Sequence, residues 1–296
     1  MTNRRARLTV GVLHQGGLLM VWAGILVLAF AGYQVWFTDL VQQHSQSQLA
    51  TRVNSFIPVD ASLPTGPPAT ATTSTATPAT GNWLGTISAP TIGLSQVILQ
   101  GTGLDQLRLG PGHYPATPLP GEAGNVAIAG HRTTWGHPFR HLDQLHVGDP
   151  VIVTTVQGRF LYRVTRSFVV DPTNTSVIQP STTNELTLTT CNPPYSAATR
   201  LVIRAVLTHS DLRSTPLHVP SSSFATTKVI SLNGGHEGWW PVFFYGEILL
   251  LAFGIGQRWW HRSANRPLVL FTLTTLCVPC ILGLFNGISW LLPAGY

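Results

Sequence analysis

The stretch ELTLTTCNPPYSAATRLVIRAVL, residues 185–207, contains two strand-like runs joined by a turn that carries two prolines. Cys191 ends the first run, and Arg200 begins the second. A proline has no N–H to donate to a sheet, so the chain must leave the sheet directly after Cys191. We therefore expect two neighbouring strands on which Cys191 and Arg200 face one another across the turn.

The same kind of strand-like run recurs from Trp83 to about His209, between residues that favour turns. The further runs are rich in Val, Ile, Leu and Thr, and they read LGTISA, SQVILQ, NVAIAGH, DPVIVTTV and RFLYRVTRSFVV. The sequence VQGRF predicts a hairpin turn, whereas FRHLDQL has the pattern of a short helix. Many short strands in so short a segment favour a mainly β fold that closes into a barrel.

Three apolar stretches, residues 8–37, 239–256 and 267–293, belong to a chain in which only 9% of the residues are charged. About 20 apolar residues are needed to cross a bilayer core, so we expect three transmembrane helices. Arginine clusters precede the first stretch and separate the last two, and such clusters favour the cytoplasmic side. This arrangement predicts a multi-pass protein of the cell membrane, with residues 38–238 outside the cell.

Alternative interpretations of these apolar stretches stay open. The sequence AFAG at residues 29–32 resembles a signal-peptidase site, so the first stretch could be a cleaved signal instead of an anchor. Glu247 lies inside the second stretch, where an ionisable residue is a functional candidate by default. The interpretation that we favour is structural: its side chain reaches the membrane–water interface or bonds to a neighbouring helix.

Linkers flank the strand-rich segment. Residues 38–57 have a weak amphipathic spacing that predicts a helical stalk, and residues 61–81 are almost wholly Ala, Pro, Thr, Ser and Gly, which predicts an extended spacer. We divide the chain into a cytoplasmic tail with the first transmembrane helix (1–37), a stalk and linker (38–82), the β domain (83–209), a second linker (210–238) and two C-terminal transmembrane helices (239–296).

The net charge of +6 does not indicate a nucleic-acid-binding protein. Six of the positive charges belong to the arginine clusters beside the apolar stretches, namely Arg4, Arg5, Arg7, Arg258, Arg262 and Arg266. The sequence has no dense basic run with interleaved aromatic residues, so we expect no nucleic-acid partner.

Cys191 has two interpretations, an inert core residue or a nucleophile. The other cysteines, Cys277 and Cys280, lie in the third apolar stretch, so Cys191 has no disulfide partner within the β domain. A nucleophilic thiol needs a positive neighbour or an adjacent base. Arg200 could stabilise an oxyanion beside it, or it could simply pair with an acid such as Glu185.

A catalytic base would come from GNVAIAGHRTTWGHPFRHLDQLH, residues 124–146, which contains four histidines. His131 directly follows a strand that has the pattern of a buried one, whereas His137, His141 and His146 fall in the next loop and short helix. A zinc site is the alternative, but the spacing matches neither H-E-x-x-H nor a CxxC pairing. We therefore expect no metal and no other cofactor.

Taken together, NVAIAGHR, TLTTC at residues 187–191 and the arginine that follows resemble the sortase family of cysteine transpeptidases, whose signature is T-L-x-T-C. The resemblance extends from Trp83 to about Leu207 and is strongest to class E, through GPGHYPATPLPGEAGNVAIAGHRTTWGHPFRHLDQLHVGD and TLTTCNPPYSAATRLVIRA. It implies an eight-stranded β-barrel with short helices. It further implies that Cys191 is the nucleophile, His131 the general acid and base, and Arg200 the group that binds the oxyanion and the substrate.

The same resemblance implies a binding groove for a sorting signal. Tyr114, in GHYP, matches a tyrosine that goes with a preference for LAxTG-like over LPxTG-like signals in class E. Thr189, Thr190 and Asn192 are expected to border this groove. The implied partners are secreted proteins with a C-terminal sorting signal, an amine of a peptidoglycan precursor as acceptor, and membrane lipid.

The sequence departs from the family pattern in having two additional C-terminal apolar stretches. Pilin-polymerising sortases carry a lid with an Asp-Pro-aromatic motif before the barrel, and residues 38–82 contain no such motif. A pilin-polymerising sortase is therefore the less favoured enzymatic alternative. A membrane-anchored β-barrel that binds without catalysis is the non-enzymatic one.

Overall fold

The computed structural model describes residues 17, 20, 21, 24–57, 62–70, 78–213, 239–262 and 266–291. These residues fall into two compact units. One contains the helical residues up to Gln34 together with α4 (Trp240–Arg262) and α5 (Arg266–Leu291), and the other begins at Val35 and contains all the strands. Residues 1–16, which include the predicted cytoplasmic tail, and the part of the second linker beyond Arg213 lie outside the described residues.

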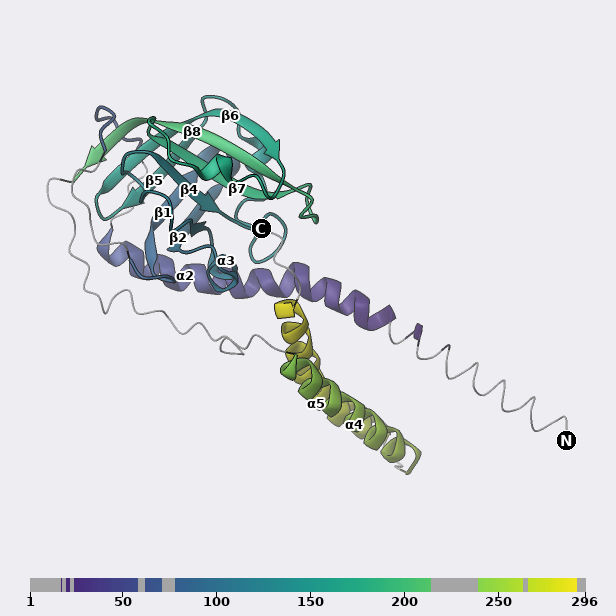
Figure 1. Cartoon of the computed structure of the whole chain (residues 1–296). Coiled ribbons are helices and arrows are strands. Elements are labelled where there is room, and N and C mark those ends of the chain that lie inside the picture. Colours follow the sequence, from purple (N-terminus) through teal and green to yellow (C-terminus); the bar gives the residue numbers. More distant parts are fainter. Residues whose placement is uncertain are drawn as a thin grey trace. The chain divides into compact units, whose positions relative to one another are not determined.

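The second unit is built on a closed barrel of eight strands, which confirms the predicted barrel (Figure 1). Around the barrel the order is β1-β2-β3-β4-β7-β8-β6-β5. The strands are β1 (Trp83–Ala89), β2 (Leu94–Gln100), β3 (Gly112–His113), β4 (Asn125–Ala129), β5 (Pro150–Thr155), β6 (Gly158–Val170), β7 (Glu185–Asn192) and β8 (Thr199–Leu212). Strand β3 is the one that the hydrophobic pattern did not predict, because only two residues form it.

The connections contain short helices and the predicted hairpin. Strands β5 and β6 pair from Thr155 and Gly158 outward, so VQGRF does form the turn. The predicted helix FRHLDQL is reduced to a single 3₁₀ turn. The short helices are η2 (Pro90–Ile92), α3 (Leu104–Leu109), η3 (Leu142–Gln144) and η4 (Thr175–Ile178).

Strand β7 alternates between the barrel interior and the outer face, as a strand must. Leu186 and Leu188 are fully buried members of the main core cluster inside the barrel. Thr187, Thr189 and Cys191 therefore point to the opposite, outer face. The residues that carry the chemistry are thus separated by the pleat from the residues that hold the barrel together.

The predicted stalk is a helix, α2 (Thr38–Phe56), but one side of it packs on the barrel. Figure 1 shows α2 beside β1, β2 and α3. Gln46 binds the backbone of β2 in both directions, because its Oε1 accepts from Val97 N–H at 2.7 Å and its Nε2 donates to Val97 O at 3.2 Å. Leu49 and Val53 join Trp83 in a second hydrophobic cluster beneath the helix.

The described part of the predicted spacer, residues 62–70 and 78–82, also includes backbone that binds the barrel. The N–H groups of Thr65 and Gly66 donate to Asp211 Oδ1 at 3.2 and 3.0 Å. Ser210 N–H in turn donates to Gly66 O at 3.2 Å. The start of this low-complexity stretch is therefore part of the folded unit, in contrast to the extended spacer that its composition predicts.

The apolar helices support the membrane prediction only in part. Among the described residues, two helices are long and apolar enough to cross a membrane, within Gly24–Phe56 and Thr272–Ser289. The apolar part of α4, Trp240–Gly256, is shorter. The described residues therefore contain two candidate spans in place of the three that the sequence predicts. Helices α4 and α5 pack closely, because a Cβ on Gly283 would lie 2.6 Å from the ring of Tyr245.

Candidate active site

Strand register brings the three predicted catalytic residues to one level of the barrel wall. Strands β4 and β7 run parallel with Ala129 opposite Thr189, and Gly130 N–H continues the ladder by donating to Thr189 O at 3.1 Å. Extending this register by two residues places His131 beside Cys191. On the other side, antiparallel β7 and β8 pair Cys191 directly with Arg200. Residues directly opposite one another on adjacent strands point to the same face, so the Cys191 and Arg200 side chains share the outer face, and His131 follows the end of the neighbouring strand.

The thiol of Cys191 sits in a nearly closed environment, because the residue is only 5% exposed. Burial raises the pKa of the Cys191 thiol above its ordinary value, while the guanidinium groups of Arg200 and Arg132 oppose this rise. Desolvation is the largest of these effects. The burial of Cys191 thus favours the neutral thiol over the thiolate.

Arg200 is fixed to the turn that separates β7 from β8. Its Nη1 donates to the carbonyl oxygens of Ala197 and Thr199 at 3.1 and 3.2 Å. The alternative in which Arg200 pairs with Glu185 is not what the structure contains, since Glu185 Oε2 binds Arg204 Nη1 at 2.8 Å. A guanidinium has five N–H donors, so Arg200 can brace the turn and also face the level of Cys191.

Arg132 also belongs to this site, although no sequence motif assigns it a role. It is 4% exposed, and its Nη1 donates to Asn192 Oδ1 at 2.7 Å and to the carbonyl oxygen of Cys191 at 3.3 Å. Its Nη2 lies 3.3 Å from Asp143 Oδ2. The sequence feature that could have indicated this role is its position directly after His131, at the end of a predicted strand. Arg132 thus joins the loop that carries His131 to the strand that carries Cys191.

The expected groove residues separate into two faces. Tyr114 Oη lies 3.2 Å from Thr189 Oγ1, which places both hydroxyl groups on the outer face near Cys191. Thr190 is fully buried on the inner face, and its hydroxyl donates to Gly130 O at 2.7 Å. Thr190 therefore holds β7 to the end of β4 and does not line a groove in this structure.

Asn192 serves the turn after the nucleophile. Its Nδ2 donates to Thr199 Oγ1 at 3.1 Å, and the Thr199 hydroxyl donates back to the carbonyl oxygen of Asn192 at 2.8 Å. Arg132, which follows β4, donates to Asn192 Oδ1. The Asn192 side chain is therefore held on one side by Arg132 and on the other by Thr199 of β8. Asn192 is thus placed to shape the rim of the site beside Cys191.

His113 fixes the segment that presents Tyr114. Its Nε2 lies 2.8 Å from the carbonyl oxygen of Pro118, which can only accept, so this nitrogen carries the proton. Its Nδ1 lies 2.9 Å from Gln100 Oε1. Burial lowers the pKa of His113, and the bond to Pro118 only partly offsets this effect. These contacts tie His113 to β2 and to the loop at Pro118.

The other histidines of this region point to separate partners. His137 Nδ1 lies 3.1 Å from Asp39 Oδ2, whereas His146 Nδ1 lies 3.9 Å from Asp149 Oδ2. His141 Nδ1 lies 3.0 Å from Gln144 Nε2. Within the described part of the chain, no three His, Cys, Asp or Glu side chains gather as metal ligands.

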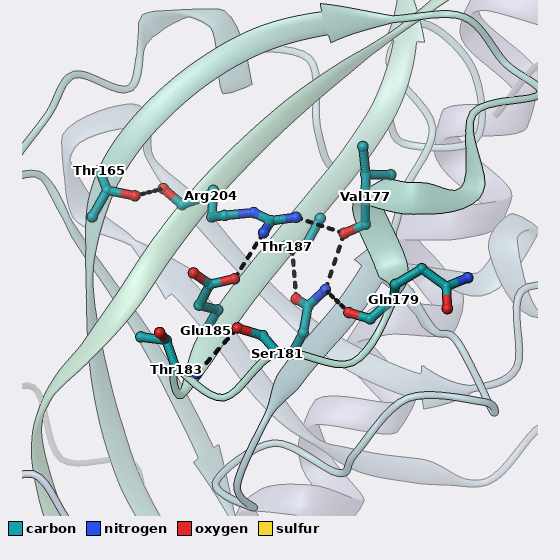
Figure 2. Close-up of polar contacts among 9 residues, drawn as sticks. Thr165, Val177, Gln179, Ser181, Thr183, Glu185, Thr187 and Arg204 are labelled. Carbon is teal, nitrogen blue, oxygen red and sulfur yellow. Dashed lines mark hydrogen bonds and ion pairs between the residues drawn. The ribbon is translucent and has the colours of Figure 1, made fainter.

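A polar network at the far end of β7 maintains the register on which the site depends (Figure 2). Arg204 Nη1 binds Glu185, and its Nη2 donates to Val177 O at 2.7 Å. Buried Asn125 donates to the carbonyl oxygens of Val177 and Gln179, each at 3.0 Å, and accepts from Thr187 Oγ1 at 2.7 Å. Side chains from β4, β7 and β8 are thereby tied to η4.

Comparison with protein families and curated proteins identifies clear similarities. A family model described as the sortase domain matches residues 87–208. Sortase SrtE1 of Streptomyces coelicolor is 30% identical over 203 residues, which cover 63% of this chain and 54% of that protein. Sortase D of Bacillus subtilis is 36% identical over 117 residues, which cover 39% of this chain and 58% of that protein. The chain therefore spans a little over half the length of these relatives.

One solved structure is also similar in sequence. The structure of sortase E from Streptomyces avermitilis is 34% identical, with a TM-score of 0.42, and the match covers 45% of this chain and 92% of that one.

Proposed function

Because the chain belongs to the sortase family of cysteine transpeptidases, we propose that it cleaves an LAxTG- or LPxTG-like sorting signal between threonine and glycine and joins the acyl product to an amine. The observation that carries this proposal is the pairing of Cys191 on β7 with Arg200 on β8, beside the end of the β4 ladder that His131 directly follows. A nucleophile, a proton carrier and a permanent cation on one face are the groups that acyl transfer needs.

In the first half of the reaction, the proton of the Cys191 thiol passes to His131, and the sulfur attacks the threonine carbonyl carbon. The carbonyl electron pair moves to oxygen, where the Arg200 guanidinium stabilises the negative charge. The C–N bond to glycine then breaks, and His131 returns its proton to the departing amine. The product is a thioester between Cys191 and the substrate protein.

In the second half, an amine attacks the thioester and His131 accepts its proton. The new amide bond forms as the C–S bond breaks, and the sulfur regains a proton from His131. The acceptor that we propose is the amine of a peptidoglycan precursor at the cell wall. Water in place of the amine gives hydrolysis by the same steps.

We assign selection of the signal to the outer face beside Cys191. Tyr114 and Thr189, whose hydroxyl groups are 3.2 Å apart, border the space next to the nucleophile, and Asn192 borders its far side. An extended signal laid over these residues would meet the Tyr114 ring with the position after leucine. This contact is the physical basis that we propose for a preference for alanine over proline there.

The cellular setting that we propose is the outer face of the cell membrane, with a multi-pass anchor. The support is the apolar character of Gly24–Phe56 and Thr272–Ser289 and the arginines that flank the apolar stretches. Secreted proteins awaiting attachment and a lipid-linked acceptor would share this surface with the enzyme.

The direct test is cleavage of fluorogenic LAxTG and LPxTG peptides by the full chain in detergent micelles. We expect cleavage by the wild type, none by Cys191→Ala and normal cleavage by Cys280→Ser, which removes a thiol outside the β domain. Equal signals from the wild type and Cys191→Ala would refute the proposed function. Tyr114→Ala, which removes the ring, should reduce the preference between the two peptides, and equal wild-type rates on both would contradict the role of Tyr114.

A further inference from the structure

The turn that follows His131 has an unusual backbone. Trp135, Gly136 and His137 have φ angles of 52°, 69° and 37°, so three successive residues lie in the left-handed region. Residues other than glycine rarely adopt this region, because the Cβ atom crowds the following carbonyl oxygen. Such a conformation persists only where surrounding contacts enforce it.

The contacts that enforce it come from the first residues of α2. Asp39 Oδ1 accepts from Gly136 N–H at 2.8 Å, and Thr38 Oγ1 accepts from Trp135 N–H at 3.2 Å. The second carboxylate oxygen of Asp39 lies 3.1 Å from His137 Nδ1. One aspartate and its neighbour thus bind all three left-handed residues.

The two segments also fit sterically. A Cβ on Gly136 would lie 2.0 Å from Gln42 Oε1. Helix α2 therefore approaches the turn more closely than a residue other than glycine at position 136 would allow. On the neighbouring residue, the Arg108 guanidinium lies over the Trp135 ring at 4.8 Å from its centroid. The helix and the turn are therefore fitted to one another at residues 42 and 136.

The turn is connected to His131 through a short backbone path. Phe139 N–H donates to His131 O at 3.0 Å, and the Phe139 side chain is fully buried in the core. Arg132, next in sequence, holds the carbonyl oxygen of Cys191. The turn lies between Arg132 and Phe139, which these bonds hold in place. The six residues between them can adopt few other conformations, so we expect a change at Trp135–His137 to displace His131.

We propose that Asp39, assisted by Thr38, is a positioning residue that holds His131 in place through the turn at Trp135–His137. The helix before the barrel is then part of the catalytic apparatus, although it contributes no group to the reacting atoms. This inference rests on the proposed transpeptidase function, because its first readout is the turnover of a sorting-signal peptide.

The test compares Asp39→Ala, Asp39→Asn and the control Asp149→Ala in the full chain. Asp149 is a matched control, because it also accepts a backbone N–H, from His146 at 2.8 Å, and faces a histidine ring. We expect Asp39→Ala to lower kcat about tenfold with little change in KM, since a small displacement of a catalytic group costs rate and not binding. Asp39→Asn keeps the oxygen that accepts from Gly136 and should recover most of the loss.

A second pair of variants tests the steric fit. Gly136→Ala introduces the contact with Gln42, whereas Gly148→Ala adds a methyl group at another left-handed glycine, φ 93°, with nothing within 4 Å. We expect Gly136→Ala to lower kcat and Gly148→Ala to leave it unchanged. All measurements are made well below the melting temperature of each variant, so that loss of folded protein does not contribute.

A readout that does not depend on turnover separates this inference from the proposed function. The rate at which iodoacetamide alkylates Cys191, followed by mass spectrometry of its peptide across pH, reports the coupling of the thiol to His131. We expect Asp39→Ala to change this pH profile and Asp149→Ala to preserve it. Absence of wild-type turnover would refute the proposed function alone. Identical kcat values and alkylation profiles for Asp39→Ala and Asp149→Ala would overturn the role of Asp39.

Discussion

At the scale of single residues, the ionisation of the Cys191 thiol is subject to opposing electrostatic effects. Its burial disfavours the thiolate, and the nearby guanidinium groups of Arg200 and Arg132 favour it. Neither arginine can lose its charge at ordinary pH, so this support is permanent. The reactivity of the thiol therefore depends on residues whose contribution does not itself titrate.

Replacing Arg132 by methionine should make Cys191 less reactive. Loss of the positive charge raises the pKa of the thiol further, so less thiolate is present at any given pH. We expect slower alkylation of Cys191 and a rate profile displaced to higher pH. Arg163→Met is the control, because Arg163 binds Gly148 O at 2.8 Å near the start of β5. Equal profiles for the two variants would show that Arg132 has no electrostatic effect on the thiol.

The sequence predicted the positions of the central residues better than their partners. Strand ends and a proline-rich turn sufficed to place Cys191 against Arg200, because strand pairing is largely a local property of a hairpin. The bonds from Arg132 to Cys191 and Asn192 join residues about 60 positions apart. No local pattern reports such a contact, which arises only when β4 and β7 pair in parallel.

At the scale of elements, the alignment of β4, β7 and β8 is what assembles the site. Asn125 and Arg204 fix this alignment from the end of β7 opposite to Cys191, through carbonyl groups near η4 (Figure 2). A shift of one residue in β7 would exchange its inner and outer faces. The polar network therefore stabilises the register that positions the Cys191 thiol, although it does not contact Cys191.

Asn125→Ala should destabilise the β-barrel unit by about 3 kcal/mol, because it removes three hydrogen bonds and leaves buried groups unpaired. Asn174→Ala should cost about 1 kcal/mol, since Asn174 caps η4 at an exposed position. Urea unfolding of residues 35–213 measures both values. A loss for Asn125→Ala no larger than that for Asn174→Ala would contradict this account of the network.

Gln46→Ala should cost about 3 kcal/mol for a related reason. Gln46 binds Val97 N–H, Val97 O and Leu109 O, and the truncation leaves these backbone groups of the β2 side buried without their partner. Gln48, two residues on, is exposed and bonds only within the helix, to His44. Gln48→Ala should change the free energy of unfolding by less than about 0.5 kcal/mol. Similar values for both variants would mean that α2 is not anchored through Gln46.

At the scale of the whole molecule, the folded unit begins earlier than the sequence predicted. The hydrophobic pattern places its start at Trp83, and the structure places it at Val35. The reason is that α2 buries glutamine and serine side chains, such as Gln42 and Ser45, and such a face has the composition of a solvated stalk. Periodicity of apolar residues cannot reveal a buried polar face whose partners are strand backbone groups.

Removal of α2 should therefore weaken the barrel. Leu49, Val53 and Ile57 are buried in the second cluster, and each contributes about 1.5–3 kcal/mol through burial. We expect residues 80–213 to be less stable than residues 35–213 by at least about 5 kcal/mol. Residues 62–213, which retain the contacts of Gly66 with Asp211, separate the effect of the helix from that of the linker. Equal melting temperatures for all three would show that α2 is only a tether.

The pairing of Gln46 with Val97 has one more consequence, which concerns association between molecules. The N–H and C=O groups of Val97 lie on the edge of β2 opposite to β1, at a level beyond the end of β3, which pairs only with Leu99 and Gln100. Without the helix, this short length of strand becomes an open edge, and open edges recruit strands from other copies. A barrel prepared without α2 is therefore expected to form dimers and aggregates through β2, whereas the intact chain keeps this edge covered by an amide side chain of its own.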